Sequence, residues 1–138
     1  MNLLKPTVTT LFMASTLGFA NAAQIIPGTG ILSDLCYNKE GGDLLGMEIH
    51  ITESHGLYNA AVQVAEGEPS TLVTVPVAVI GNQVTFTVVA GPDETGRYAG
   101  RVTRAGFVGT CTVTTPGQTV INRLRLLRKK KSYWKARN

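Results

Sequence analysis

The chain has 138 residues, of which 43% are hydrophobic and 16% are charged, and its formal net charge is +4. This length supplies one hydrophobic core but not two, so we expect a single domain. No stretch beyond the N-terminal region is long and apolar enough to span a membrane, which takes roughly 20 apolar residues.

The N-terminus has the three-part pattern of a secretory signal. A single positive charge, Lys5, precedes an uncharged and largely apolar run over residues 8–19, and Ala20-Asn21-Ala22 provides the small residues that a signal peptidase reads. A transmembrane anchor is the alternative, but the run is too short for one. We therefore expect cleavage after Ala22, with residues 23–138 forming the mature domain in the periplasm or outside the cell.

Apolar and polar residues alternate with a period of two along most of the mature chain, which predicts β-strands. The alternating runs lie at residues 46–52, 59–64, 73–79, 84–88, 98–102, 107–113 and 120–126. An earlier run over residues 31–38 is ambiguous in phase. Turn residues separate the runs, and Gly81-Asn82 indicates a short hairpin. Pro76 lies inside a strand pattern, which suggests an edge position or a bulge.

Eight strands with short connections predict mostly antiparallel neighbours around one core. Closing such a sheet removes its exposed edges, so we expect a small antiparallel barrel of about eight strands, with a two-sheet β-sandwich as the alternative. The inward positions hold mainly Val and Ala, which suits a tightly filled core. Inward-facing Gly100 and Gly109 would permit close packing or tight coiling.

The chain contains two cysteines, Cys36 and Cys111. Because export places them in an oxidising compartment, we expect a disulfide between them, and two unpaired thiols are the alternative. The bond would tie the first strand to the penultimate one. Two cysteines without a CxxC motif do not make a structural zinc site.

Basic residues concentrate at the C-terminus, where eight of the thirteen Lys and Arg residues lie in the last sixteen positions. This segment could bind an anionic surface, and the alternative is a solvated strand end. The candidate surface-binding residues are Arg128, Lys129, Lys130, Lys131, Tyr133 and Trp134. Aromatic residues do not alternate with the basic ones, so nucleic acid is not an expected partner. Tyr133-Trp134 could anchor the chain to a partner or plug the end of the barrel.

Two groups of titratable residues are weak candidates for chemistry. Glu48, His50, Glu53 and His55 combine carboxylates and imidazoles, which can bind a metal, but ordinary solvent-facing residues are the better interpretation. A second group, Asp34, Glu40 and Asp43, surrounds the first turn, where acidic residues are common. No nucleophile motif or glycine-rich phosphate loop is present. We therefore expect no catalytic residues, no metal site and no cofactor.

Several short segments look familiar when taken together, namely residues 37–46, 62–69, 98–100, 107–109 and 127–134, together with Phe86. Together they resemble a group of small exported proteins of Gram-negative bacteria with no assigned function. Members end in a basic run followed by Ser-Tyr-Trp. The resemblance covers nearly the whole mature chain and implies a periplasmic or surface-associated domain. It supplies no catalytic residues, and the cysteine pair is not part of the pattern.

Together these features favour a non-enzymatic binding module. Its partner would be a small ligand inside the barrel or an envelope protein, which the loop at residues 66–70 could contact. One alternative is a protein that associates with lipid or another anionic surface through its basic tail. A metal-dependent hydrolase that uses His50 and His55 is the least favoured.

Overall fold

The computed structural model describes residues 30–133, so the expected signal peptide at residues 1–22 and Trp134 lie outside the described residues. The described chain forms nine β-strands and no helix, and hence no helix that could cross a membrane. The strands are β1 (Gly30–Ser33), β2 (Cys36–Asn38), β3 (Asp43–Ser54), β4 (Leu57–Pro69), β5 (Val73–Ile80), β6 (Gln83–Val89), β7 (Thr95–Val102), β8 (Gly106–Thr115) and β9 (Gln118–Lys129).

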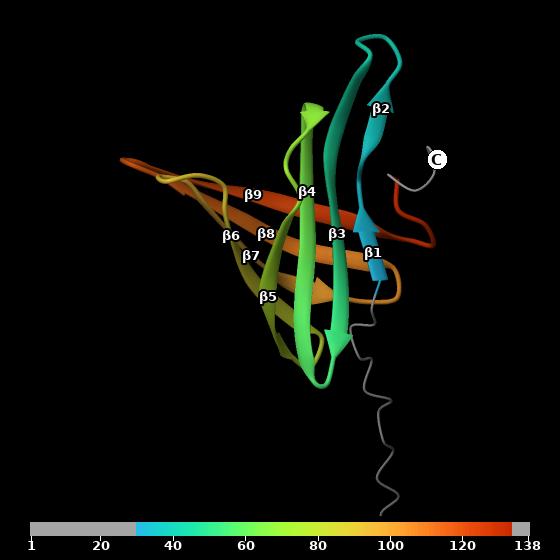
Figure 1. Cartoon of the computed structure of the whole chain (residues 1–138), viewed down its shortest axis with the longest axis vertical. Helices are drawn as coiled ribbons and strands as arrows, with labels where there is room; N and C mark the ends of the chain where they lie inside the picture. Colours follow the sequence, from blue (N-terminus) through green and yellow to red (C-terminus); the bar gives the residue numbers. More distant parts are fainter. Residues whose placement is uncertain (1–29, 134–138) are drawn as a thin grey trace, which may run out of the picture.

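Eight of these strands close into an antiparallel barrel, as the sequence predicts, and the sandwich alternative is not adopted (Figure 1). Consecutive strands from β3 to β9 pair with one another. The ring closes through β1, which pairs with β3 on one side and with β9 on the other. The ninth strand, β2, pairs with β3 and stands outside the ring.

The first predicted strand is broken at Asp34, which explains the ambiguous phase of its sequence. The Asp34 carboxylate accepts a hydrogen bond from the backbone N–H of Met47 at 2.7 Å, and the Asp34 N–H donates to the Met47 carbonyl at 3.1 Å. Opposite this point, Gly46 has a φ of 104°, and a Cβ there would lie 2.8 Å from the Asp34 carbonyl oxygen. A glycine is therefore needed where the strand breaks.

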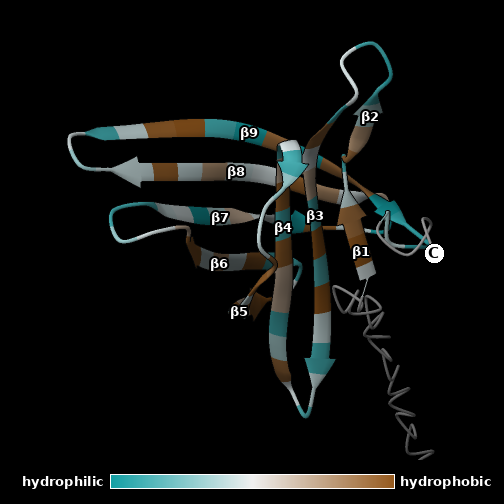
Figure 2. Cartoon of the chain, turned by 45° about the horizontal axis from the view of Figure 1, so that its top comes forward, coloured by the Kyte–Doolittle hydropathy of each residue, from teal (hydrophilic) through white to brown (hydrophobic). Residues whose placement is uncertain are grey.

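The predicted alternation is confirmed, because apolar and polar residues alternate along the strands (Figure 2) and the alternating apolar residues form the buried core, with Val120 at the start of β9 as an exposed exception. In β6, for example, Val84, Phe86 and Val88 are buried between less buried neighbours. The largest side chains that are fully buried are Leu32, Ile49, Ile51, Val84, Val102, Phe107 and Leu126. Burial of these side chains is the main source of the barrel's stability.

The predicted close packing at Gly100 and Gly109 is also confirmed. The two glycines lie opposite each other on β7 and β8. The Phe107 ring lies over both of them, since a Cβ would lie 2.6 Å from its Cζ atom at Gly100 and 2.8 Å from it at Gly109. The missing side chains thus make the space that Phe107, the largest fully buried side chain, fills.

Pro76 lies in an internal strand, but in a segment of β5 with only one partner. Residues Val73 to Val77 pair with β4, and pairing with β6 begins at Ala78. Pro76 is therefore locally at an edge, which is where a residue without a backbone N–H disturbs a sheet least.

Candidate ligand-binding cavity

The barrel is closed and filled at one end but open at the other. Strand β1 has only four residues, so it joins β3 to β9 over Glu48–Ile51 and Leu127–Lys129 alone. Beyond Asp34 the chain leaves the ring as β2, and the part of β9 before Leu127 pairs with β8 only. At this end, therefore, no strand within residues 30–133 joins β3 to β9.

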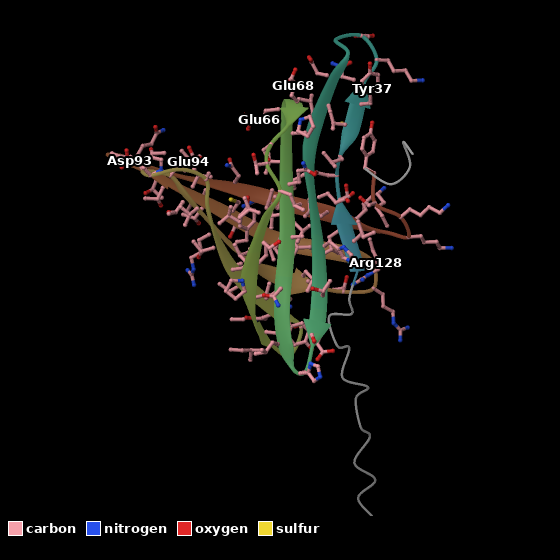
Figure 3. All side chains as sticks on the ribbon, viewed as in Figure 1. Tyr37, Glu66, Glu68, Asp93, Glu94 and Arg128 are labelled. Carbon is pink, nitrogen blue, oxygen red and sulfur yellow. The ribbon has the colours of Figure 1, made fainter. Side chains whose placement is uncertain are left out.

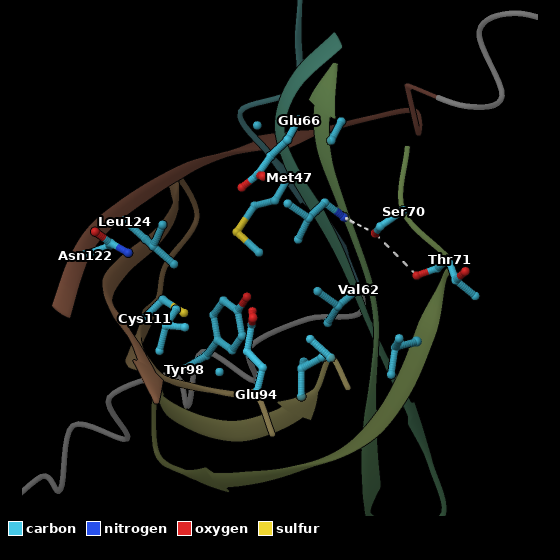
Figure 4. A pocket seen from close by; sticks show the side chains of 18 of the residues that line it. Met47, Val62, Glu66, Ser70, Thr71, Glu94, Tyr98, Cys111, Asn122 and Leu124 are labelled. Carbon is cyan, nitrogen blue, oxygen red and sulfur yellow. Dashed lines mark hydrogen bonds between the residues drawn. The ribbon is translucent and has the colours of Figure 1, made fainter. Parts of the chain in front are cut away.

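A cavity of about 780 Å³ occupies the open half. This volume lies within the roughly 300–1,000 Å³ of typical ligand sites. Its wall comes from β3 to β9 and is largely apolar (Figure 4). The apolar lining residues are Leu45, Met47, Val62, Val64, Ala65, Val73, Val88, Val89, Ala90, Val113 and Leu124. The expectation of a tightly filled core thus holds for one half of the barrel only.

An aromatic pair lies between the filled half and the cavity. The rings of Phe86 and Tyr98 stack with their centroids 4.7 Å apart, and Tyr98 lines the cavity together with Cys111. The pKa of the Tyr98 hydroxyl is raised, first by burial and then by a hydrogen bond with Cys111 and by the negative charge of Glu94. Tyr98 therefore stays neutral at physiological pH and places a polar hydroxyl in an apolar wall.

Carboxylates surround the mouth of this cavity. Glu66, Glu68 and Glu94 line it together with Asp34. Figure 3 shows Glu66 and Glu68 at the end of β4 and Glu94 beside the turn that precedes β7. In the sequence, Asp34 stands among the acidic residues around the first predicted turn, and the barrel brings it to the cavity. Glu66 and Glu68 belong to the loop predicted to contact a protein. Sequence reasoning missed their convergence with Glu94, because only the barrel brings these positions together.

The predicted disulfide is wrong, because Cys36 and Cys111 are not close and both are free thiols. Cys36 is exposed on β2, outside the closed ring, whereas Cys111 is buried on the inner face of β8. A disulfide requires Cα atoms within about 7 Å of each other. The break at Asp34 moves Cys36 out of the ring and away from the barrel interior.

The two thiols are expected to differ strongly in reactivity. Burial raises the pKa of the Cys111 thiol and opposes formation of the reactive thiolate, while Cys36 is open to solvent. Iodoacetamide at neutral pH should therefore modify one cysteine of the native protein quickly and the second only after unfolding, as followed by mass spectrometry. Cys36→Ser should remove the fast step. A protein in which neither thiol reacts before reduction would contradict the structure.

The residues considered for metal binding do not form a common site. No three His, Cys, Asp or Glu residues within 30–133 are grouped so as to hold a metal ion. His50 and His55 are both exposed, and Glu53 accepts a hydrogen bond from the Gly56 N–H at 2.6 Å. Glu48 is buried rather than solvent-facing, so the interpretation of it as an ordinary surface residue is wrong.

Glu48 binds the C-terminal segment on the outer face of β3. Alternation places its side chain on the opposite side of the strand from Met47 and Ile49, which face the core. Its carboxylate accepts hydrogen bonds from the Ser132 hydroxyl and, at 3.0 Å, from the backbone N–H of Tyr133. The segment thus lies against the barrel wall, and the structure does not support the idea that Tyr133 plugs the barrel end.

The basic residues of the tail differ in their roles. Arg128 donates two hydrogen bonds to the Thr103 carbonyl, at 3.3 and 3.0 Å, and so connects β9 to the turn between β7 and β8. Lys129, Lys130 and Lys131 are exposed. Binding of this segment to an anionic surface stays a prediction.

No family model, no curated protein and no solved structure matches this chain.

Proposed function

We propose that this chain is an exported, non-enzymatic protein that binds a small, largely apolar molecule in the open half of its barrel. The observation that supports the proposal is the cavity of about 780 Å³ with an apolar wall. Replacing the water against an apolar surface of this kind with an apolar ligand lowers the free energy. The secretory-signal pattern at residues 1–22 supports a location in the periplasm or outside the cell.

The character of the polar groups supports binding rather than catalysis. Among the described residues that line the cavity, the titratable groups are carboxylates at the mouth together with Tyr98 and Cys111. The pKa values of both Tyr98 and Cys111 are raised, so neither is activated as a nucleophile or a general base at neutral pH. A neutral hydroxyl in an apolar wall is typical of a group that orients a ligand.

A pair of matched substitutions on β8 tests this proposal. Val113 lines the cavity, whereas Val108 on the same strand is 59% exposed on the outer face. The probe is naphthylmethanol, which is apolar and uncharged, and calorimetric titration measures its binding. We expect Val113→Phe to weaken binding by about tenfold or more, because the added ring occupies ligand volume. Val108→Phe should leave binding unchanged.

Circular dichroism and thermal unfolding must show that both variants fold as the parent does. If the folded Val113→Phe protein binds the probe as tightly as Val108→Phe does, the probe binds outside the cavity and the proposal fails. A parent protein that binds no probe would overturn it directly.

A further inference from the structure

The charges around the cavity have a single sign. Four of the nine acidic residues of the chain line it, Asp34, Glu66, Glu68 and Glu94, and no Lys or Arg within residues 30–133 does. The chain as a whole carries a formal net charge of +4, so the overall composition does not account for this separation. An apolar cavity with a rim of one sign concentrates the electrostatic field at its mouth and favours ligands of the opposite sign.

Three of the four carboxylates have no partner within the described chain. The Asp34 carboxylate accepts the N–H of Met47, as described above, but the carboxylates of Glu66, Glu68 and Glu94 form no hydrogen bond or ion pair with any residue in 30–133. Glu66 and Glu94 reach into the cavity from opposite sides, Glu94 beside the Tyr98 hydroxyl (Figure 4). Their negative charges therefore act on the space that a ligand would occupy.

The arrangement does not suit a metal ion. A bound divalent cation needs several oxygen ligands at about 2.0–2.6 Å from one point. The carboxylates come instead from β4 and from the connection before β7, and no three acidic, His or Cys groups in the described chain are gathered closely enough. A larger cation, whose charge lies at one end of an apolar body, matches the separation between apolar wall and acidic mouth.

We propose that the cavity selects organic cations, namely molecules with an apolar body and a protonated or quaternary amine. The body would lie against Met47, Val62 and Leu124, and the charged end would lie between Glu66 and Glu94. The oxygen of the buried Tyr98 hydroxyl, which lines the cavity, can accept a hydrogen bond from a protonated amine. This inference rests on the proposed function and names its ligand class.

Three probes with one ring system and different charges test the inference. Naphthylmethylamine is a cation at neutral pH, naphthylmethanol is neutral and naphthylacetate is an anion. In calorimetric titrations at 0.01 M salt, we expect the cation to bind about tenfold more tightly than the alcohol and the anion to bind most weakly. The difference should shrink at 1 M salt, where the screening length falls from about 30 Å to about 3 Å.

Two double variants that remove the same net charge show whether the preference for the cation comes from the carboxylates of the cavity. Glu66→Gln with Glu94→Gln should reduce the affinity for the cation by about tenfold and leave the affinity for the alcohol unchanged. Glu40→Gln with Glu53→Gln removes the same net charge from exposed positions outside the cavity and should change neither affinity.

The possible outcomes separate the two proposals. If the cation and the alcohol bind equally, or if both double variants weaken cation binding alike, the charge selection is wrong while apolar binding in the cavity stands. If none of the three probes binds, the proposed function fails as well.

Discussion

Replacement of Gly109 by alanine is expected to destabilise the barrel by about 3 kcal/mol. The added methyl group would meet the backbone of β7 and would lie 2.8 Å from Cζ of Phe107. Neither neighbour can move easily, because Gly109 is paired with Gly100 across the sheet and Phe107 is 1% exposed. Urea unfolding should show the loss, and the thermal midpoint should fall by more than about 10 °C.

Gly91 provides the matched control. It lies between β6 and β7, and a Cβ at this position would meet no atom within 4 Å. Gly91→Ala should therefore change the free energy of unfolding by less than about 0.5 kcal/mol. Equal stability of the Gly109 and Gly91 variants would mean that Phe107 does not pack on the glycine pair.

Replacement of Glu48 by alanine is expected to cost about 2 kcal/mol and to release the C-terminal segment from β3. Glu48 is 5% exposed, and its loss would leave the Tyr133 N–H without its acceptor. Glu48→Gln should cost less, because an amide can accept from Tyr133 and donate to the Ser132 hydroxyl.

Trypsin provides a direct measure of this release, since Lys129, Lys130 and Lys131 immediately precede the bound residues. Cleavage there should be about tenfold faster in Glu48→Ala than in the parent, because opening of the segment precedes cleavage. His50→Ala, at the next outward position on β3, serves as the control and should be cleaved as the parent is. Identical cleavage of all three proteins would show that Glu48 does not hold the segment.

Alternation in the sequence was sufficient to predict the barrel, because each strand presents one apolar face to one core. The alternation of Val84, Phe86 and Val88 and the glycines at positions 100 and 109 carry that information locally. The break at Asp34 was visible only as an ambiguous phase. The break leaves a ring that is closed at one end by the four residues of β1. This closure depends on the pairing of β1 with both β3 and β9, which the sequence does not show.

The site was less predictable, since it depends on contacts between distant positions. Glu48 and Ser132 are 84 residues apart, so no periodicity in the sequence indicates that one binds the other. The cavity likewise lies where no strand within residues 30–133 joins β3 to β9, whereas alternation predicts only which side chains face inward. The disulfide prediction relied on the cellular compartment and not on the positions of Cys36 and Cys111.

The four-residue strand β1 also divides the barrel into two regions that differ in how well they tolerate substitutions. Leu32 and Ile49 lie opposite each other where β1 joins β3, and substitutions there would open the ring itself. Side chains such as Val73 and Val113 lie at the open end, where they are only partly buried. Substitutions at the open end could therefore change the ligand that we propose for the cavity, while the closed end preserves the fold.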